Sequence, residues 1–202
     1  NKSDWGSGLY IQDASAVIRN CVISGNISSR KGAIYNVNSD VKVINTTIAG
    51  NTASSTDAAG GIYAENLSAP MYVINSIINY NSPPQFGYDF GINHIVLVNS
   101  NFPNDDSDSD SPDNPFHSQA EVILVDNVYT DPLFEEDEWS LGQIVVDYNL
   151  NLSLGSPCIN TGTFSYEIDD VDIVGLLLDY ITQEDCIDNG GSWDGLLCYY
   201  YD

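Results

Sequence analysis

The sequence predicts an all-β chain wound as a right-handed parallel β-helix, a single-stranded solenoid closed by a loop-rich C-terminal cap. Three observations predict this fold. Segments rich in Val, Ile and Tyr alternate with turns of Gly, Asn, Ser and Asp. Similar segments recur at intervals of 24 to 30 residues, and repeats of this size on β-rich sequence indicate stacked coils. Asparagines occupy matching places in these repeats.

The repeat is clearest at residues 60–81, GGIYAENLSAPMYVINSIINYN. A Gly-Gly pair precedes a short apolar strand at Ile62 and Tyr63, and a polar corner leads to a second strand at residues 72–74. A last strand ends at Asn81. Residues 7–26 and 32–51 have the same pattern, so we expect each segment to form one coil.

Two series of asparagines mark equivalent positions in successive coils. The first series is Asn20, Asn45, Asn75 and Asn99. The second series follows six residues later and consists of Asn26, Asn51 and Asn81, with Asp105 in the fourth place. We predict that both series point inward and stack into ladders whose amides hydrogen-bond from coil to coil. The alternative, a run of unrelated hairpins, predicts no fixed offset between the two series.

The predicted domain organisation follows from where this pattern stops. The coils occupy residues 1–134, with inserted loops at 82–91, where Pro and Gly break the pattern, and at 103–119. Residues 122–129 return to strand, residues 131–134 form a turn, and residues 144–147 and 150–154 read as further strands. We expect a closing cap module at 135–180 and a disulfide-loop tail at 181–202.

The charge distribution excludes some classes of binding partner. The chain contains five basic and 29 acidic residues, its net charge is −24, and no Lys or Arg follows position 42. Such a surface repels nucleic acid and anionic membranes and attracts divalent cations. No apolar run approaches the roughly 18 residues of a membrane span. The chain begins partway through a coil, so we expect upstream coils of a longer chain, or self-association, to cover that end.

Four cysteines are present. Cys186 and Cys198 bracket a loop that contains a Gly-Gly pair, which predicts a local disulfide and an oxidising compartment. Two free thiols are the alternative. Cys21, beside Asn20, and Cys158 are expected to be small buried residues, and a bridge between these two would require the two ends of the solenoid to meet.

Two parts of the chain resemble known families. The Gly-rich strand entries and the closing motifs ISGN, IAGN and INYN resemble repeats of β-helical bacterial polymorphic outer-membrane proteins and autotransporter-like adhesins. Residues 131–134 (DPLF), 147–163 (DYNLNLSLGSPCINTGT) and 168–180 (IDDVDIVGLLLDY) are similar to the choice-of-anchor module that closes secreted bacterial β-helix proteins. Asn160 replaces the usual Asp of that module, the Arg before Ile173 is absent, and Ile181 stands where Gly is usual. The resemblance implies a secreted or cell-surface solenoid without catalytic residues.

The sequence gives little support for a catalytic function. Lyases that act on uronates need basic residues on one face, but the counterparts of Arg19 in the next coils are Ile44 and Ile74. Hydrolases need two carboxylates about 5–9 Å apart, and the acidic pairs of this chain lie in predicted loops. Neither His94 nor His117 lies near a Gly-framed Ser. We therefore expect a non-catalytic protein, with a carbohydrate-active β-helix enzyme as the alternative.

Two acidic groups in the sequence suggest a bound cation, and the first lies in the acidic loop at residues 104–114. Asp106, Asp108 and Asp110 have the spacing of the first half of a Ca²⁺ loop. No Gly follows at the sixth position and His117 replaces the Glu at the twelfth, so a solvated acidic loop is the alternative. A second acidic group consists of Glu167, Asp169, Asp170 and Asp172. Ca²⁺ bound at either group would fit a third hypothesis, a calcium-stabilised glycan-binding module.

Surface features complete the functional expectation. Asn66 heads an N-x-S sequon in a polar corner and is the preferred glycosylation candidate, whereas Asn45 is set aside because we expect it to point inward. Several aromatic residues could stack on sugars or pack over the solenoid ends: Tyr80, Phe86, Tyr88, Trp139, Trp193, Tyr199, Tyr200 and Tyr201. The sequence thus favours an extracellular structural or adhesive surface protein, a filament subunit in one form of this hypothesis, with a surface glycan as a candidate partner.

Overall fold

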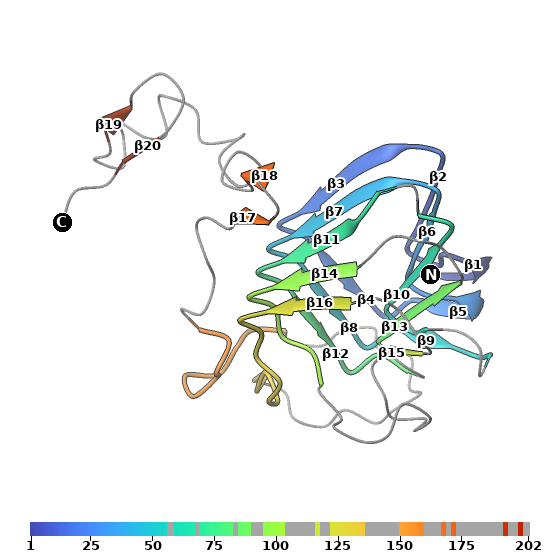
Figure 1. Ribbon diagram of the computed structural model, residues 1–202. Coiled ribbons are helices and arrows are strands. Elements are labelled where there is room, and N and C mark those ends of the chain that lie inside the picture. Colours follow the sequence, from blue (N-terminus) through green and yellow to red (C-terminus); the bar gives the residue numbers. More distant parts are fainter. Residues whose placement is uncertain are drawn as a thin grey trace. The chain divides into compact units, whose positions relative to one another are not determined.

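The computed structural model is a parallel β-solenoid of about four turns, which confirms the predicted all-β solenoid fold (Figure 1). The structure describes residues 1–55, 59–67, 69–82, 85–89, 95–103, 116–117, 122–135 and 150–159, together with short strands at 167–168, 171–172, 192–193 and 198–199. None of these residues is helical. The chain divides into two compact units, residues 1–162 and 163–202.

Four parallel sheets, which we name A to D, form the sides of the solenoid. Sheet A contains β1 (Lys2–Trp5), β5 (Ile27–Lys31) and β9 (Thr52–Ala53). Sheet B contains β2 (Leu9–Gln12), β6 (Ile34–Val37), β10 (Ile62–Glu65), β13 (Phe86–Asp89) and β15 (Phe116–His117). Sheet C contains β3 (Ser15–Arg19), β7 (Asp40–Ile44), β11 (Met71–Ile74), β14 (Ile95–Val98) and β16 (Val122–Val125). Sheet D contains β4 (Val22–Ser24), β8 (Thr47–Ala49) and β12 (Ile77–Asn79).

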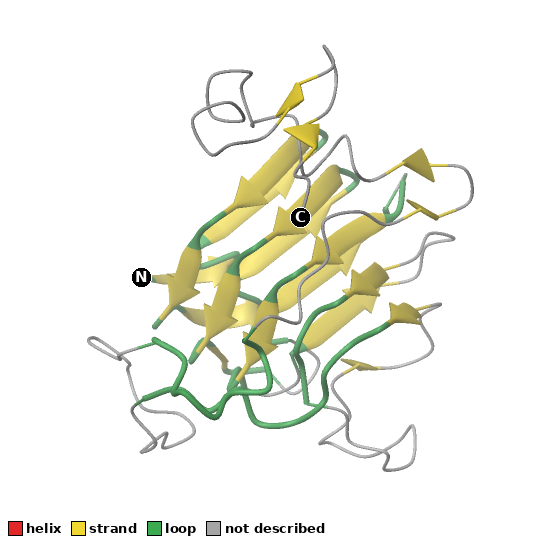
Figure 2. Cartoon of the chain, turned by 90° about the vertical axis from the view of Figure 1, so that its left-hand side faces the viewer, coloured by secondary structure: helices red, strands yellow, loops and turns green. Residues whose placement is uncertain are grey.

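Each coil passes through the sheets in the order A, B, C, D, so equivalent strands lie side by side (Figure 2). We number the coils from the N-terminus: coil 1 holds β1–β4, coil 2 holds β5–β8, coil 3 holds β9–β12, coil 4 holds β13 and β14, and coil 5 holds β15 and β16. Isolated bridges extend sheet D through Asn101 and Val128. Strand pairing in register places equivalent residues of successive coils directly above one another.

The core consists of columns of apolar side chains between the sheets. In sheet B, Ile34, Ile62 and Phe86 are register partners and all three are fully buried. Further columns come from sheets C and D, and they contain Val43, Val73 and Leu97, and Ile48 and Ile78. Burial of this apolar surface is the main stabilising contribution. Val and Ile are common in the coil repeats because their branched side chains suit buried strand positions.

The corners explain much of the asparagine content. At the corner between sheets C and D, one residue per coil has a positive φ near 50°: Asn20, Asn45, Asn75, Asn99 and Asp126. Positive φ angles also occur at the corner between sheets B and C, in Asp13, Asn38 and Asn66. After sheet D they occur in Gly25, Gly50 and Tyr80. The left-handed conformation is costly for most residues but accessible to Asn, Asp and Gly. The repeat is therefore imposed in part by the bends of the backbone.

The predicted loop at 82–91 and the predicted excursion at 103–119 are wrong in part. Phe86–Asp89 is strand β13, which pairs with β10 of coil 3, and Phe86 enters the core. Within the second segment, Phe116–His117 forms β15 and pairs with β13. Gly87 lies inside β13, so this glycine does not break the strand. Of the strand predicted at 150–154, the structure contains one bridge, between Leu152 and Phe134.

The described residues of the second unit form two short antiparallel pairs. Strand β17 (Glu167–Ile168) pairs with β18 (Val171–Asp172), and β19 (Ser192–Trp193) pairs with β20 (Cys198–Tyr199). The predicted cap at 135–180 lies largely outside the described residues, as does the tail at 181–202, and their boundaries stay predictions. Within the described ranges, no helix is long and apolar enough to cross a membrane.

Candidate functional site

The second asparagine series forms a buried ladder inside the solenoid. Asn26 Nδ2 donates to Asn51 Oδ1 over 2.9 Å, and Asn51 Nδ2 donates to Asn81 Oδ1 over 2.8 Å. Each Oδ1 also accepts the backbone N–H of the coil before it, from Asn26 over 3.0 Å and from Asn51 over 3.1 Å. Gln85 Oε1 completes the ladder by accepting Asn81 Nδ2 over 2.8 Å. Asp105, expected in the fourth place, lies outside the described residues.

The first asparagine series lies on the outer surface, and the expectation that it points inward is wrong. Asn20 and Asn45 are exposed, and Asn75 and Asn99 are half-buried. Their positive φ angles turn the side chains away from the core. Their backbone N–H groups still bond between coils, as from Asn45 to the Ile74 carbonyl over 3.0 Å. The reason for setting Asn45 aside as a glycosylation acceptor therefore fails.

The residue after each outer asparagine points inward and replaces the predicted ladder. Thr46 Oγ1 donates to the Ile44 carbonyl over 2.9 Å, and Ser76 Oγ and Ser100 Oγ make the equivalent bonds two residues back. Ser76 Oγ accepts the Thr46 N–H over 3.1 Å, and Ser100 Oγ accepts the Ser76 N–H over 3.1 Å. The dipeptides Asn-Thr, Asn-Ser and Asn-Ser at these corners are a sequence signal for this hydroxyl ladder that we did not use.

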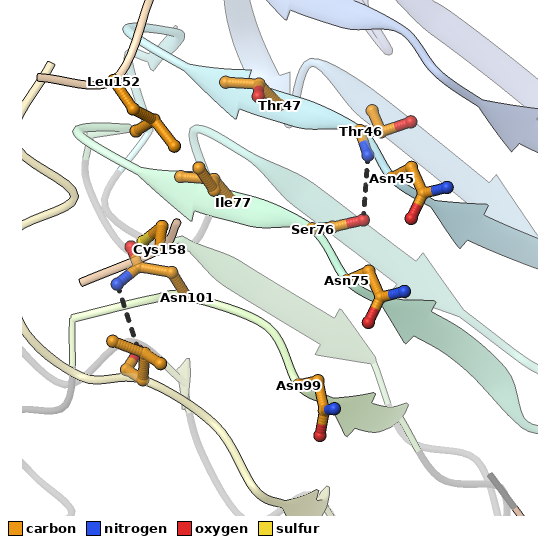
Figure 3. A pocket seen from close by; sticks show the side chains of 11 residues that line it. Asn45, Thr46, Thr47, Asn75, Ser76, Ile77, Asn99, Asn101, Leu152 and Cys158 are labelled. Atoms are coloured by element: carbon orange, nitrogen blue, oxygen red, sulfur yellow. Dashed lines mark hydrogen bonds between the residues drawn. The ribbon is translucent and has the colours of Figure 1, made fainter. Parts of the chain in front are cut away.

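A pocket of about 310 Å³ lies on the outer side of this corner (Figure 3). Asn45, Asn75 and Asn99 come from three successive coils and lie one above another along it. The opposite wall is formed by Leu152 and Cys158, which belong to the segment at residues 150–159. The described residues that line it are Asn45, Thr46, Thr47, Asn75, Ser76, Ile77, Asn99, Asn101, Val128, Leu152 and Cys158. Amides, hydroxyls, a thiol and aliphatic groups thus meet in the pocket, and none of these described lining residues is charged.

Cys21 and Cys158 are both free thiols in the structure, so the bridge considered between them is not formed. Cys21 is exposed, which corrects the expectation that it is buried, and its Sγ donates to the Arg19 carbonyl over 3.0 Å. Burial raises the pKa of the Cys158 thiol, and the Ser156 side chain acts in the opposite direction. The Cys158 thiol is therefore protonated at neutral pH. Cys186 and the side chain of Cys198 lie outside the described residues.

An aromatic column on sheet B was missed by the sequence reasoning. Tyr10, Tyr35 and Tyr63 are register partners, with ring centroids 5.1 Å apart for the first pair and 6.0 Å for the second. Lys31 Nζ lies 3.6 Å from the Tyr63 ring centroid, within the range of a cation–π interaction. The next register position is Gly87, where a Cβ would lie 2.7 Å from the Tyr63 ring. Tyr63 therefore packs over coil 4, and the column ends there.

Tyr35 couples this column to pH. Its hydroxyl donates to Glu65 Oε2 over 2.5 Å, and burial together with this bond raises the pKa of Tyr35 well above its usual value. The unfolded chain therefore releases this proton first, at about pH 10, and the contribution of Tyr35 to stability is lost as the pH rises above that value.

We expect the Tyr35→Phe variant to lose less stability between about pH 9 and pH 11 than the parent protein does. Urea unfolding across this range checks the prediction, with Tyr10→Phe as the control; equal pH slopes for the parent and Tyr35→Phe would contradict it.

The remaining predicted site residues are placed only in part. Asn66 is exposed at the corner between sheets B and C, with a φ of 50°. Asp106, Asp108 and Asp110 lie outside the described residues, as do Asp169 and Asp170. Among the residues that the structure describes, no group of three or more His, Cys, Asp or Glu side chains could hold a metal ion.

Comparison of the chain with protein-family models, with curated proteins and with solved structures gives no significant match. The resemblance to outer-membrane repeats and to a choice-of-anchor module therefore stays a hypothesis. What the residues and the structure support together is a parallel β-solenoid whose asparagine-rich corner carries a pocket, and the described residues that line this pocket are uncharged.

Proposed function

We propose that this chain is a non-catalytic, extracellular structural and adhesive solenoid that associates end to end with further copies of itself. The observation that carries the proposal is the open edge of coil 1. Among the described strands, β1 to β4 each have a neighbour on one side only. Each therefore presents a row of backbone groups that a further strand can pair with.

Exposed apolar side chains accompany these open edges. Leu9 begins the core column that continues into Ile34 and is 37% exposed, whereas Ile34 is fully buried. At the opposite end, Leu124 follows Leu97 in its column and is 41% exposed. Stacking the first coil of one copy on the last coil of another would bury both residues. Such contacts between unlike ends do not close on themselves and generate filaments.

The charge distribution supports contacts between unlike ends. All five basic residues lie within the first 42 positions, which contain only three acidic residues, Asp4, Asp13 and Asp40. The remainder carries the other acidic residues and no Lys or Arg. A weakly basic end and an acidic body attract each other over distances up to the Debye length, about 10 Å at 0.1 M salt. The extracellular location rests on the family resemblance and on the predicted Cys186–Cys198 disulfide.

Polar columns of the solenoid support a structural role. The hydroxyls of Thr46, Ser76 and Ser100 each bond within their own coil and accept a backbone N–H from the coil before. The amides of Asn51 and Asn81 are equally committed to neighbouring coils. Side chains whose hydrogen-bonding capacity holds coils together are poorly suited to act as nucleophile or base, and this favours the structural role over the alternative of a carbohydrate-active enzyme.

Sedimentation velocity tests the association. We expect the sedimentation coefficient to increase with protein concentration, and the increase to be smaller at high salt. Val17 lies in the edge strand β3 and is 48% exposed. Proline is tolerated in an edge strand, but it lacks the backbone N–H group that a strand of another copy would need for pairing. Val17→Pro should therefore reduce association at least about tenfold, whereas Val17→Thr, which keeps the N–H and the branched side chain, should associate like the parent. A parent protein that stays monomeric at all concentrations would refute the proposal.

A further inference from the structure

The pocket beside the outer asparagines has the composition of a ligand site. Asn45, Asn75 and Asn99 lie in equivalent positions of coils 2, 3 and 4, so their amides recur at about the 4.8 Å spacing of neighbouring strands. Thr47 and Ile77 are register partners in sheet D and line the same pocket. The row of amides thus runs alongside a hydroxyl and an aliphatic side chain (Figure 3).

Backbone geometry alone does not require these amides. A positive φ is equally available to Gly, which is the residue used at the next corner, at Gly25 and Gly50. At the corner between sheets B and C, Asn38 Nδ2 is occupied by a 2.7 Å bond to Asp13 Oδ1. The Asn45 side chain, in contrast, is exposed and lines the pocket. It can offer a donor and an acceptor to a ligand.

Asn99 gives a second, independent indication. Its Oδ1 atom is buried and has no hydrogen-bond partner. Buried carbonyl oxygens are rarely left without a donor. Rotation of this amide towards the pocket would let a ligand hydroxyl donate to Oδ1, so occupancy of the pocket would satisfy a group that the protein leaves unsatisfied.

We propose that this pocket binds a neutral carbohydrate, with amides of Asn45, Asn75 and Asn99 on the sugar hydroxyls and Ile77 and Leu152 against the C–H face of a ring. The inference names a ligand for the adhesive part of the proposed function and rests on it. Asparagine amides match vicinal hydroxyls because they donate and accept at adjacent atoms. The pocket volume of about 310 Å³ is at the lower end for small-molecule sites and suits a short sugar segment.

Charge determines the class of sugar. The pocket lining contains no Lys or Arg to neutralise a uronate or a sulfate, and the chain as a whole has a net charge of −24. An anionic sugar would be repelled by this field. Neutral hexose or N-acetylhexosamine chains would not be, and their hydroxyl and amide groups supply the partners that the pocket requires.

Cys158 provides a direct readout because its thiol lines the pocket. Because burial raises the pKa of Cys158, the full chain is alkylated at alkaline pH for long enough that Cys158 is modified when no sugar is present. The modification of each cysteine is followed by mass spectrometry. Neutral oligosaccharides of glucose, mannose and N-acetylglucosamine serve as probes, and an oligogalacturonate serves as the charged comparison. We expect at least one neutral probe to protect Cys158 in a saturable manner while the exposed Cys21 stays reactive, and we expect no protection by the oligogalacturonate.

Glycine variants identify the residues involved without changing the corner. Asn45→Gly and Asn75→Gly keep a residue that favours positive φ and remove the amide, and each should raise the half-protecting concentration about tenfold, as expected for the loss of one or two hydrogen bonds. Asn20→Gly is the matched control, because Asn20 has the same place in coil 1 and does not line the pocket. Absence of protection by every neutral probe, or equal effects of Asn20→Gly and Asn45→Gly, would overturn the inference. Neither result would alter end-to-end association, so the two proposals fail separately.

Discussion

The Asn51→Ala variant is expected to lose about 3–5 kcal/mol of unfolding free energy, because two or three buried polar groups lose their partners at about 1–3 kcal/mol each. Asn51 is the middle member of the inner ladder and is almost completely buried. A loss of this size approaches the whole stability of many domains, which is about 5–15 kcal/mol. We expect the variant to be largely unfolded at moderate temperature.

The groups affected can be named from the hydrogen bonds. Asn51 Oδ1 is the acceptor for the Asn26 backbone N–H, at 3.0 Å. Asn51 Nδ2 donates to the Ile23 carbonyl over 2.9 Å and to the Ala49 carbonyl over 3.2 Å. Alanine satisfies none of these groups, and the core leaves little room for water. The loss also weakens the contacts of coil 2 with coils 1 and 3, because neighbouring repeats of a solenoid stabilise one another through their interface.

Urea unfolding measured by circular dichroism checks this prediction, and Asn20→Gly is the appropriate control. Asn20 is exposed with a φ of 52°, and glycine adopts this conformation without strain. We expect the control to change stability by less than about 0.5 kcal/mol. If Asn51→Ala costs less than about 1 kcal/mol, the inner ladder does not stabilise the solenoid in the way that its hydrogen bonds indicate.

The repeat spacing was sufficient to predict the solenoid because the fold itself is periodic. A residue at one position of a coil meets its equivalent in the next coil, so a spacing read from Asn26 to Asn51 to Asn81 directly gives contacts. Spacing does not, however, say which way a side chain points. Asn20 and Asn45 have the same regularity as the inner ladder, and they lie outside because a left-handed residue at the bend reverses the in–out alternation.

The pocket could not be predicted because two distant segments form it. The asparagine row comes from coils 2 to 4, but Leu152 and Cys158 follow β16, the last described strand of the solenoid, by about one repeat length. No periodicity connects the two segments. The aromatic column could have been found, since Tyr10, Tyr35 and Tyr63 recur with the coil spacing. Tyrosine is common in β-strands of every kind, so its presence alone does not indicate a stacked column.

Coil 4 is the part of the fold where the prediction from the sequence and the structure differ most. A substitution at Phe86 tests whether this coil packs onto coil 3. The predicted loop at 82–91 would leave this side chain at the surface. In the structure, Phe86 is fully buried, follows Ile62 in the core column of sheet B, and packs edge-on against Phe102 with ring centroids 6.0 Å apart. Removing a buried phenylalanine side chain costs about 3–5 kcal/mol, so we expect Phe86→Ala to lose this much stability in urea unfolding.

Leu154→Ala is the control for this loss, because Leu154 is fully exposed in the same unit and its truncation should change stability by less than about 0.5 kcal/mol. If Phe86→Ala behaves like the control, residues 85–89 form a surface loop and the solenoid ends at coil 3. The distinction also affects function, because Asn99 belongs to the same coil as Phe86. If coil 4 is not packed onto coil 3, Asn99 no longer lies in the row of amides. The pocket then loses the residue whose buried Oδ1 atom has no hydrogen-bond partner.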